Sequence, residues 1–218
     1  MFKTLIKIFL VAAIIVLTSC TENVIKIACV GDSITEGYGL AEQSKTSYPV
    51  VLDSLLGNKY SVLNCGRSAA TLQKKGNFPF WICKEFSNVF AYNPDIIIVM
   101  LGTNDTKTEN WNAANFEKDY KALIDTFKTI STNPKIYLCL PVPVFKTVWT
   151  INDSTVVNGI IPIIKRVAKE NDLPVIDMYN SMKDQSKNYI EGIHPNEKGA
   201  KVMAQIFARE IIKRGNKK

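Results

Sequence analysis

The chain has 218 residues, of which 46% are hydrophobic, and this length and composition suit one domain with a single core. The formal net charge is +7, from 27 basic and 20 acidic residues. Two of the basic residues precede an N-terminal apolar run, and four lie beyond residue 212. The rest of the chain is therefore nearly neutral. No dense stripe of Lys and Arg with interleaved aromatic residues occurs, which argues against a nucleic-acid partner.

The first 20 residues have the pattern of a lipoprotein signal peptide. Lys3 and Lys7 precede an apolar run over residues 8–17, which leads into Leu17-Thr18-Ser19-Cys20. This run has about half the length that a membrane-spanning helix needs. Its end is similar to a bacterial lipobox, which implies that Cys20 carries a lipid and becomes the mature N-terminus. We therefore expect an exported protein, anchored to a bacterial membrane on its periplasmic or cell-surface side; secretory cleavage with an unmodified Cys20 is the alternative.

The remaining cysteines and the single histidine make a metal site improbable on sequence grounds. Cys29, Cys65, Cys83 and Cys139 form no Cys-x-x-Cys pair, and two of them lie in apolar runs where buried strands are expected. Free, packed thiols are therefore expected. With one His in the chain, a zinc site would need thiolates at unsuitable spacings, so we expect neither metal nor cofactor.

Short runs rich in β-branched residues alternate with helical patterns along the chain. In chain order they predict a strand at 24–30, a helix at 48–56, and strands at 60–63 and 95–101. A helix over 116–130, capped by Asn115, and a strand at 135–140 follow. The remaining elements are a helix over 153–170 that restarts or kinks at Pro162, a strand at 173–178, and a last helix that begins after Asn196. The apolar run at 96–101 has no alternation, which is typical of a central strand covered on both faces.

This alternation of strands and helices predicts an α/β fold. We expect a single domain over residues 24–214 with a doubly wound, flavodoxin-like, parallel five-stranded sheet and helices on both faces.

Chemically informative residues follow the predicted strands, where ligands bind in parallel sheets. The first strand leads into Gly31-Asp32-Ser33, the second into Cys65-Gly66-Arg67-Ser68 and the third into Gly102-Thr103-Asn104-Asp105. The single histidine, His194, follows the last strand within Glu191-Gly192-Ile193-His194-Pro195-Asn196. A base such as imidazole is what a weakly nucleophilic serine hydroxyl needs.

These four blocks, in this order, resemble those of the SGNH (GDSL) hydrolase family over nearly all of the mature chain. The resemblance implies that Ser33 is the nucleophile and His194 its general base. It also implies that Gly66 and Asn104 donate hydrogen bonds to the oxyanion together with the Ser33 backbone N–H. The family usually carries Asp three residues before the histidine, whereas this chain has Glu191. We expect Glu191 to complete the triad; orientation of the imidazole by a backbone carbonyl is the alternative.

Each block also has a structural interpretation when it is taken alone. Ser33 with Glu36 fits the Ser-x-x-Glu capping box of a helix. Gly66 fits a turn, and Asn104 with Asp105 fits a turn or a helix cap. Only the joint occurrence of the blocks favours catalysis.

The implied reaction is hydrolysis of an ester through an acyl-serine, without a cofactor. Among family members the chain resembles sialate and other carbohydrate O-acetylesterases, through Lys74-Lys75-Gly76, Phe80-Trp81, Asn110-Trp111 and Ile151-Asn152-Asp153. An acetylated carbohydrate is then the expected substrate, held in a small acyl pocket. Trp81, Trp111 and Trp149 are candidates for stacking on sugar or, equally, for capping the core. The alternatives are a lysophospholipase or thioesterase of the same family, and a non-catalytic glycan-binding lipoprotein.

Overall fold

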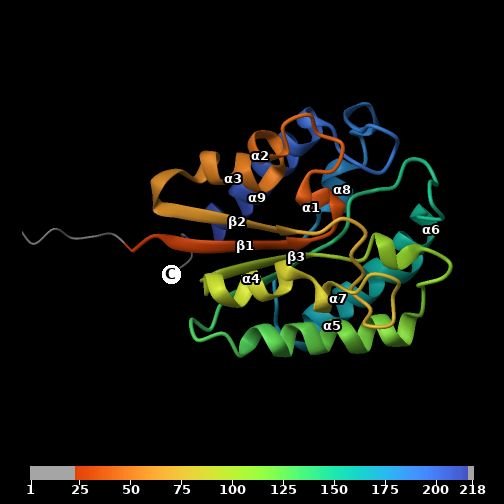
Figure 1. Ribbon diagram of the computed structural model, residues 1–218, viewed down its shortest axis with the longest axis horizontal. Coiled ribbons are helices and arrows are strands. Elements are labelled where there is room, and N and C mark those ends of the chain that lie inside the picture. Colours follow the sequence, from red (N-terminus) through yellow and green to blue (C-terminus); the bar gives the residue numbers. More distant parts are fainter. Residues whose placement is uncertain (1–22, 216–218) are drawn as a thin grey trace, which may run out of the picture.

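The computed structural model describes residues 23–215. A five-stranded parallel sheet in the order β2-β1-β3-β4-β5 forms the centre of the molecule (Figure 1). Its strands are β1 (Ile25–Gly31), β2 (Tyr60–Gly66), β3 (Ile96–Met100), β4 (Lys135–Cys139) and β5 (Val175–Ile176). The predicted α/β fold with a doubly wound parallel sheet is thus confirmed.

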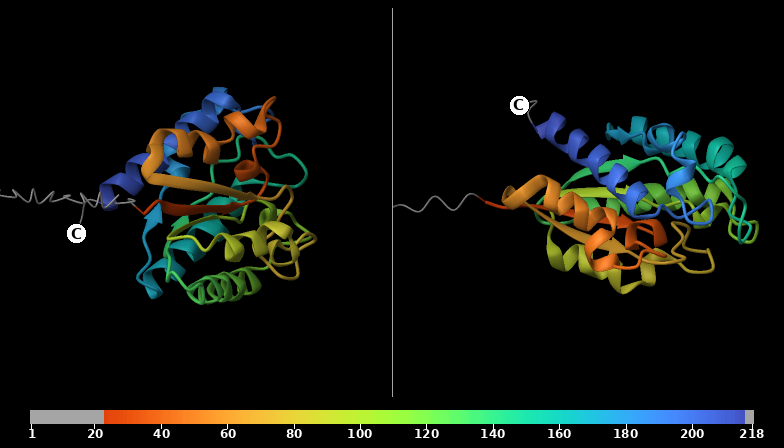
Figure 2. Two further views of the ribbon diagram at one scale, coloured as in Figure 1. Left: turned by 60° about the vertical axis from the view of Figure 1, so that its left-hand side comes forward. Right: turned by 90° about the horizontal axis from the view of Figure 1, so that it is seen from above.

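Helices cover both faces of the sheet (Figure 2). One face carries α1 (Ser33–Glu36), α2 (Gln43–Thr46), α3 (Tyr48–Leu56), α8 (Met178–Met182) and α9 (Glu197–Gly215). The other carries α4 (Lys84–Tyr92), α5 (Ala113–Lys128) and α7 (Ile161–Glu170), the last preceded by α6 (Asp153–Thr155) and a π-helical segment (Val156–Ile160). Short 3₁₀ turns lie at Gly57–Lys59, Phe80–Ile82, Asn104–Thr106 and Ser186–Asn188.

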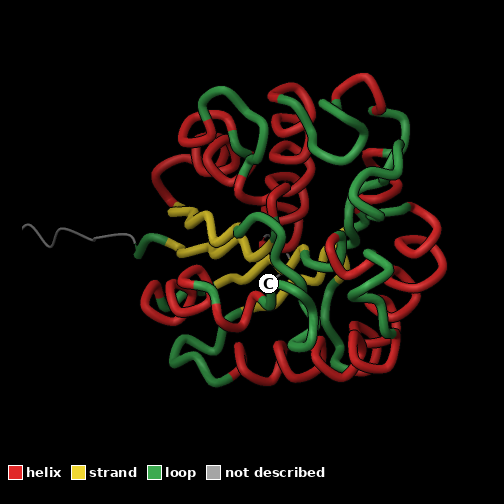
Figure 3. Tube along the Cα trace, turned by 45° about the vertical axis from the view of Figure 1, so that its right-hand side comes forward, coloured by secondary structure: helices red, strands yellow, loops and turns green. Residues whose placement is uncertain are grey.

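Alternate residues of the central strands enter two hydrophobic layers, so the sheet divides the single core expected from length and composition into two parts. Ile97 and Val99 pack with α4, α5 and α7, whereas Ile96 and Ile98 pack with α3 and α9. All five residues of β3 are buried, which confirms the central position predicted from its unbroken apolar run. Figure 3 shows the strands enclosed by helices and loops.

Two strands differ from their predicted lengths by more than two residues. β2 continues through Asn64 to Gly66, because its pairing with β1 extends to Gly31 opposite Gly66. β5 is confined to Val175–Ile176. Pro174, which lacks an N–H, precedes it, and Asp177 follows it as the N-cap of α8.

The predicted helices are present, with one wrong cap. Asn112, not Asn115, caps α5, and its side chain accepts the N–H of Asn115. Near Pro162 the helix changes type and does not start afresh, since α7 begins at Ile161 directly after the π-helical segment with helical backbone on both sides. The helix α4 was not predicted.

The four cysteines among the described residues are buried, as predicted, and their thiols are free in the structure. No helix within residues 23–215 combines the length and the apolar character that crossing a membrane requires. The predicted signal peptide and Cys20 lie outside the described residues.

Candidate active site

The serine of the first block lies at the carboxyl end of β1, where the chain turns sharply into α1. A Cβ on Gly31 would overlap the side chain of Thr35, so only glycine permits this close turn. Asp32 is the N-cap of α1, and its Oδ1 accepts the N–H of Ile34 at 3.0 Å. Ser33 therefore occupies the first position of the helix, beside the switch point between β1 and β3 where doubly wound sheets bind ligands.

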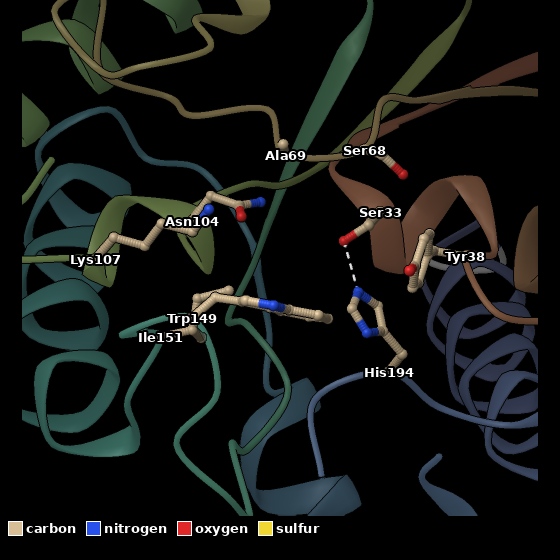
Figure 4. A pocket seen from close by; sticks show the side chains of 9 residues that line it. All are labelled: Ser33, Tyr38, Ser68, Ala69, Asn104, Lys107, Trp149, Ile151 and His194. Carbon is tan, nitrogen blue, oxygen red and sulfur yellow. Dashed lines mark hydrogen bonds between the residues drawn. The ribbon is translucent and has the colours of Figure 1, made fainter. Parts of the chain in front are cut away.

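The structure brings Ser33, His194 and Glu191 together (Figure 4 shows the first two). Ser33 Oγ lies 2.8 Å from His194 Nε2. His194 Nδ1 is hydrogen-bonded to Oε1 of Glu191, whose Oε2 accepts the His194 backbone N–H at 3.4 Å. The residue His194 is 4% exposed, and its carbonyl accepts the N–H of Ile190 at 2.8 Å. One nitrogen thus faces the serine, and the other faces a carboxylate.

The capping-box interpretation of Ser33 and Glu36 is wrong. Asp32 provides the cap, and Glu36 instead accepts hydrogen bonds from the backbone N–H of Ser68, at 2.7 Å, and from its hydroxyl. Glu36 thereby ties the loop after β2 to the helix that carries Ser33.

Of the two predicted oxyanion donors, one lies in the pocket beside Ser33 and the other does not. Asn104 is buried in the 3₁₀ turn after β3 and lines the pocket beside Ser33, with Nδ2 donating to the Ala70 carbonyl at 3.2 Å. Gly66 does not line this pocket. Its N–H donates to Asn64 Oδ1 at 2.8 Å, and a Cβ there would overlap the backbone of Thr35 and Glu36. Gly66 is required for close packing of β2 against α1.

Sequence reasoning missed Ala69, which lines the pocket three residues after Gly66. Its φ of 65° lies in the left-handed region that alanine seldom adopts. The backbone N–H groups of Ala69 and Ser33 make no hydrogen bond to another described residue. Glycine or asparagine at position 69 would have signalled this conformation in the sequence, whereas alanine does not.

The pocket has a volume of about 190 Å³. It is lined by Ser33, Tyr38, Ser68, Ala69, Asn104, Lys107, Trp149, Ile151 and His194 (Figure 4). Two aromatic rings flank the imidazole, with centroids 4.7 Å away for Tyr38 and 6.1 Å away for Trp149.

Of the three tryptophans, only Trp149 lines this pocket. Trp81 donates a hydrogen bond from Nε1 to the Leu72 carbonyl at 2.8 Å, and its ring lies under the ammonium of Lys74. Its role is therefore structural. Trp111 packs on Phe116. Trp149 is 55% exposed, and it and Thr150 have φ values of 51° and 61°. Such backbone strain in a pocket wall favours a role in binding.

Two buried carboxylates support the surrounding loops. Asp105 accepts the N–H groups of Leu72 and Gln73 at 2.9 Å each, and burial raises the pKa of Asp105 to about 6. Burial raises the pKa of Asp32 to about 7, and its Oδ2 has no partner among the described residues. No three His, Cys, Asp or Glu side chains within residues 23–215 are grouped so that they could hold a metal ion.

Comparisons with known proteins agree with this architecture. The sequence model of the GDSL-like Lipase/Acylhydrolase family matches residues 29–202. An acetylxylan esterase of Xylanibacter ruminicola is 40% identical over 87% of this chain and 44% of its own length. A multidomain esterase of Ruminococcus flavefaciens is 27% identical over 55% of this chain and 16% of its own length. The chain thus spans less than half the length of these curated relatives.

Solved structures share the fold over most of the chain. The aryl esterase of M. smegmatis has a TM-score of 0.68 at 20% identity and covers 87% of this chain and 99% of its own. An acetyl xylan esterase, AlAXEase, has a TM-score of 0.67 at 22% identity, covering 86% and 100%. The lipase/acylhydrolase of Enterococcus faecalis has a TM-score of 0.69 at 22% identity, covering 87% and 96%.

Proposed function

Since the chain belongs to the GDSL-like lipase/acylhydrolase family, we propose that it is a serine esterase that removes O-acetyl groups from carbohydrates. The observation that carries this proposal is the pair Ser33 Oγ and His194 Nε2, 2.8 Å apart, with Glu191 on the opposite side of the imidazole. This is the geometry of a serine activated by a base whose orientation a third group maintains.

The proposed reaction proceeds through an acetyl-enzyme. Ser33 Oγ attacks the ester carbonyl and transfers its proton to His194 Nε2. Glu191 accepts the Nδ1–H bond, selects the correct tautomer and stabilises the imidazolium. His194 then protonates the departing sugar hydroxyl, and the acetyl group stays on Ser33. A water molecule that gives its proton to His194 releases acetate and restores the serine.

The tetrahedral oxyanion needs donors that are already in place. The N–H of Ser33 and the side-chain amide of Asn104 meet this need in our proposal, as the sequence resemblance implies. Ala69 supplies the third donor in place of Gly66, because the Gly66 N–H already bonds to Asn64 while the Ala69 N–H is uncommitted in the pocket wall. The left-handed φ of Ala69 would then be strain held at a catalytic position.

Pocket size and relatives support acetyl as the acyl group and a carbohydrate as the alcohol. The cavity of about 190 Å³ is below the roughly 300–1,000 Å³ of sites that enclose larger ligands. Trp149 offers an exposed ring at its edge, and the 40% identical relative is an acetylxylan esterase. The proposed substrates include O-acetyl esters of sialate and of plant glycans. Export and membrane anchoring through Cys20 are also proposed, on the lipobox pattern alone.

Two measurements test the function. Ser33→Ala should abolish release of acetate from 4-nitrophenyl acetate and acetylated xylan oligosaccharides, with an unchanged circular dichroism spectrum. Ser87→Ala, at an exposed serine of α4, is the control and should stay near wild type. Full activity in Ser33→Ala would contradict the assignment.

Chain-length preference separates this function from a lysophospholipase. Each added methylene would contribute about 0.8 kcal/mol in an apolar groove, whereas a small enclosed site rejects the longer chain. We expect kcat/KM to fall from aryl acetate through butyrate to octanoate. A steady rise through octanoate would refute the acetylesterase and favour the lipid substrate.

A further inference from the structure

One charged side chain in the pocket wall has no role in the proposed chemistry. Lys107 lines the pocket and is half-buried. Apart from Lys107, all of the lining side chains that the structure describes are uncharged or belong to the proposed Ser–His couple. Lys107 is therefore the feature most able to distinguish substrates by charge.

The Lys107 ammonium has no counterion among the described residues. Lys45, Lys121 and Lys128 each have a carboxylate partner, but no ion pair or hydrogen bond engages Lys107 Nζ within residues 23–215. The two nearest acidic residues in the chain have other partners: Asp105 accepts the N–H groups of Leu72 and Gln73, and Glu109 accepts a hydrogen bond from Thr150 at 3.3 Å. Neither of them lines the pocket. A half-buried cation in a pocket favours an anionic ligand.

The backbone holds Lys107 in place beside the proposed oxyanion site. Its N–H donates to the Asn104 carbonyl at 3.3 Å, and its own carbonyl accepts the N–H groups of Asn110 and Trp111 at 2.9 Å each. In Figure 4, Lys107 and Trp149 lie on the Asn104 side of the pocket, and Tyr38 lies on the opposite side, next to His194. A ring bonded to the reacting acetyl group and extending toward the Asn104 side of the pocket would therefore meet both the indole and the ammonium.

We propose that Lys107 and Trp149 form a subsite for an acidic sugar, so that the preferred substrate is an O-acetylated sugar ring that also carries a carboxylate. The ammonium donates a charge-assisted hydrogen bond to that carboxylate, and the indole packs against the apolar face of the ring. This inference rests on the proposed function and adds the substrate class.

The test compares two substrates that differ only in charge. These are the methyl glycoside of O-acetylated glucuronate and the same glycoside with the carboxylate replaced by its isosteric, neutral carboxamide. Acetate release gives kcat/KM for each at low and high salt. Wild type should prefer the carboxylate about tenfold, as one charge-assisted hydrogen bond allows. The preference should shrink at high salt.

Variants connect the preference to Lys107. In Lys107→Met the ratio of the two kcat/KM values should fall to about one, while Lys107→Arg should keep most of it. Lys165→Met, at an exposed lysine of α7, removes the same charge away from the pocket and should keep the wild-type ratio. Trp149→Ala should raise KM for both sugars.

The outcomes separate this inference from the function beneath it. Wild type that hydrolyses 4-nitrophenyl acetate but treats the carboxylate and the carboxamide alike overturns the acidic-sugar subsite and leaves the esterase standing. An unchanged ratio in Lys107→Met also overturns it. Failure to hydrolyse any acetate ester overturns both proposals.

Discussion

Replacing Asp32 by Asn tests how the fold accommodates a carboxylate directly before the proposed nucleophile. Asp32 is 1% exposed. Its Oδ1 accepts the Ile34 N–H, and its Oδ2 has no partner among the described residues. Burial raises the pKa of this carboxyl from 3.8 to about 7, and the Ile34 hydrogen bond offsets only part of the rise. Its ionised form is therefore unfavourable in the folded protein.

The sign and size of the effect follow from that pKa. An acid with a higher pKa in the folded state stabilises the fold fully below its unfolded pKa of 3.8, and this stabilisation is lost as pH rises through about 7. The difference corresponds to about 4 kcal/mol of unfolding free energy. Asn cannot ionise, but it places two amide N–H donors where the protonated carboxyl has one O–H, and an unmatched buried donor costs about 1–3 kcal/mol at every pH. Asp32→Asn should thus be less stable than wild type at pH 4 and more stable at pH 8.

Urea unfolding at pH 4, 6 and 8 measures this crossover. Asp105, whose pKa burial raises to about 6, is present in both proteins, so its effect largely cancels in the difference. Asp184→Asn, at an exposed site, is the control and should change stability by no more than about 0.5 kcal/mol. Parallel pH dependences in wild type and Asp32→Asn would refute the argument from burial.

Other predictions concern the proposed catalytic and anchoring residues. Asn104→Ala should lower kcat by about 10²–10³, the usual effect of losing one oxyanion donor; a change confined to KM would show that Asn104 only binds substrate. Glu191→Gln should lower kcat, and Glu191→Asp should keep part of it; wild-type kinetics in the Gln variant would mean that backbone groups orient His194. Ala69→Gly should raise the unfolding free energy by about 0.5–1 kcal/mol in urea titrations, because relief of left-handed strain exceeds the added freedom of the unfolded chain; a loss of stability would contradict this. Cys20→Ala should move the protein from the membrane fraction to the soluble fraction, and an unchanged distribution would exclude Cys20 as the anchor.

Local patterns were enough to predict most of the architecture. The unbroken apolar run of β3 indicated burial on both faces, and Pro49 with Gly57 marked the two ends of α3. Because parallel strands bring their carboxyl ends to one edge, residues 161 positions apart, Ser33 and His194, could be expected to meet. The helix α4 also carries a helical pattern, with Phe86, Val89 and Phe90 spaced to lie on one face, so the sequence contained the signal for this unpredicted helix.

The identity of individual donors depended on contacts between distant segments. Gly66 matches the family pattern, but its N–H donates a hydrogen bond to the side chain of Asn64. The backbone of α1 fills the space where a Cβ of residue 66 would lie. Ser33 and Glu36 matched a capping box, but Asp32 is the cap and Glu36 bonds to Ser68 in the loop after β2. Sequence gives residue types and their spacing along the chain. Hydrogen bonds and packing between loops that meet only in the folded protein decide which backbone N–H is left without a partner and which of the three tryptophans lines the pocket of Ser33.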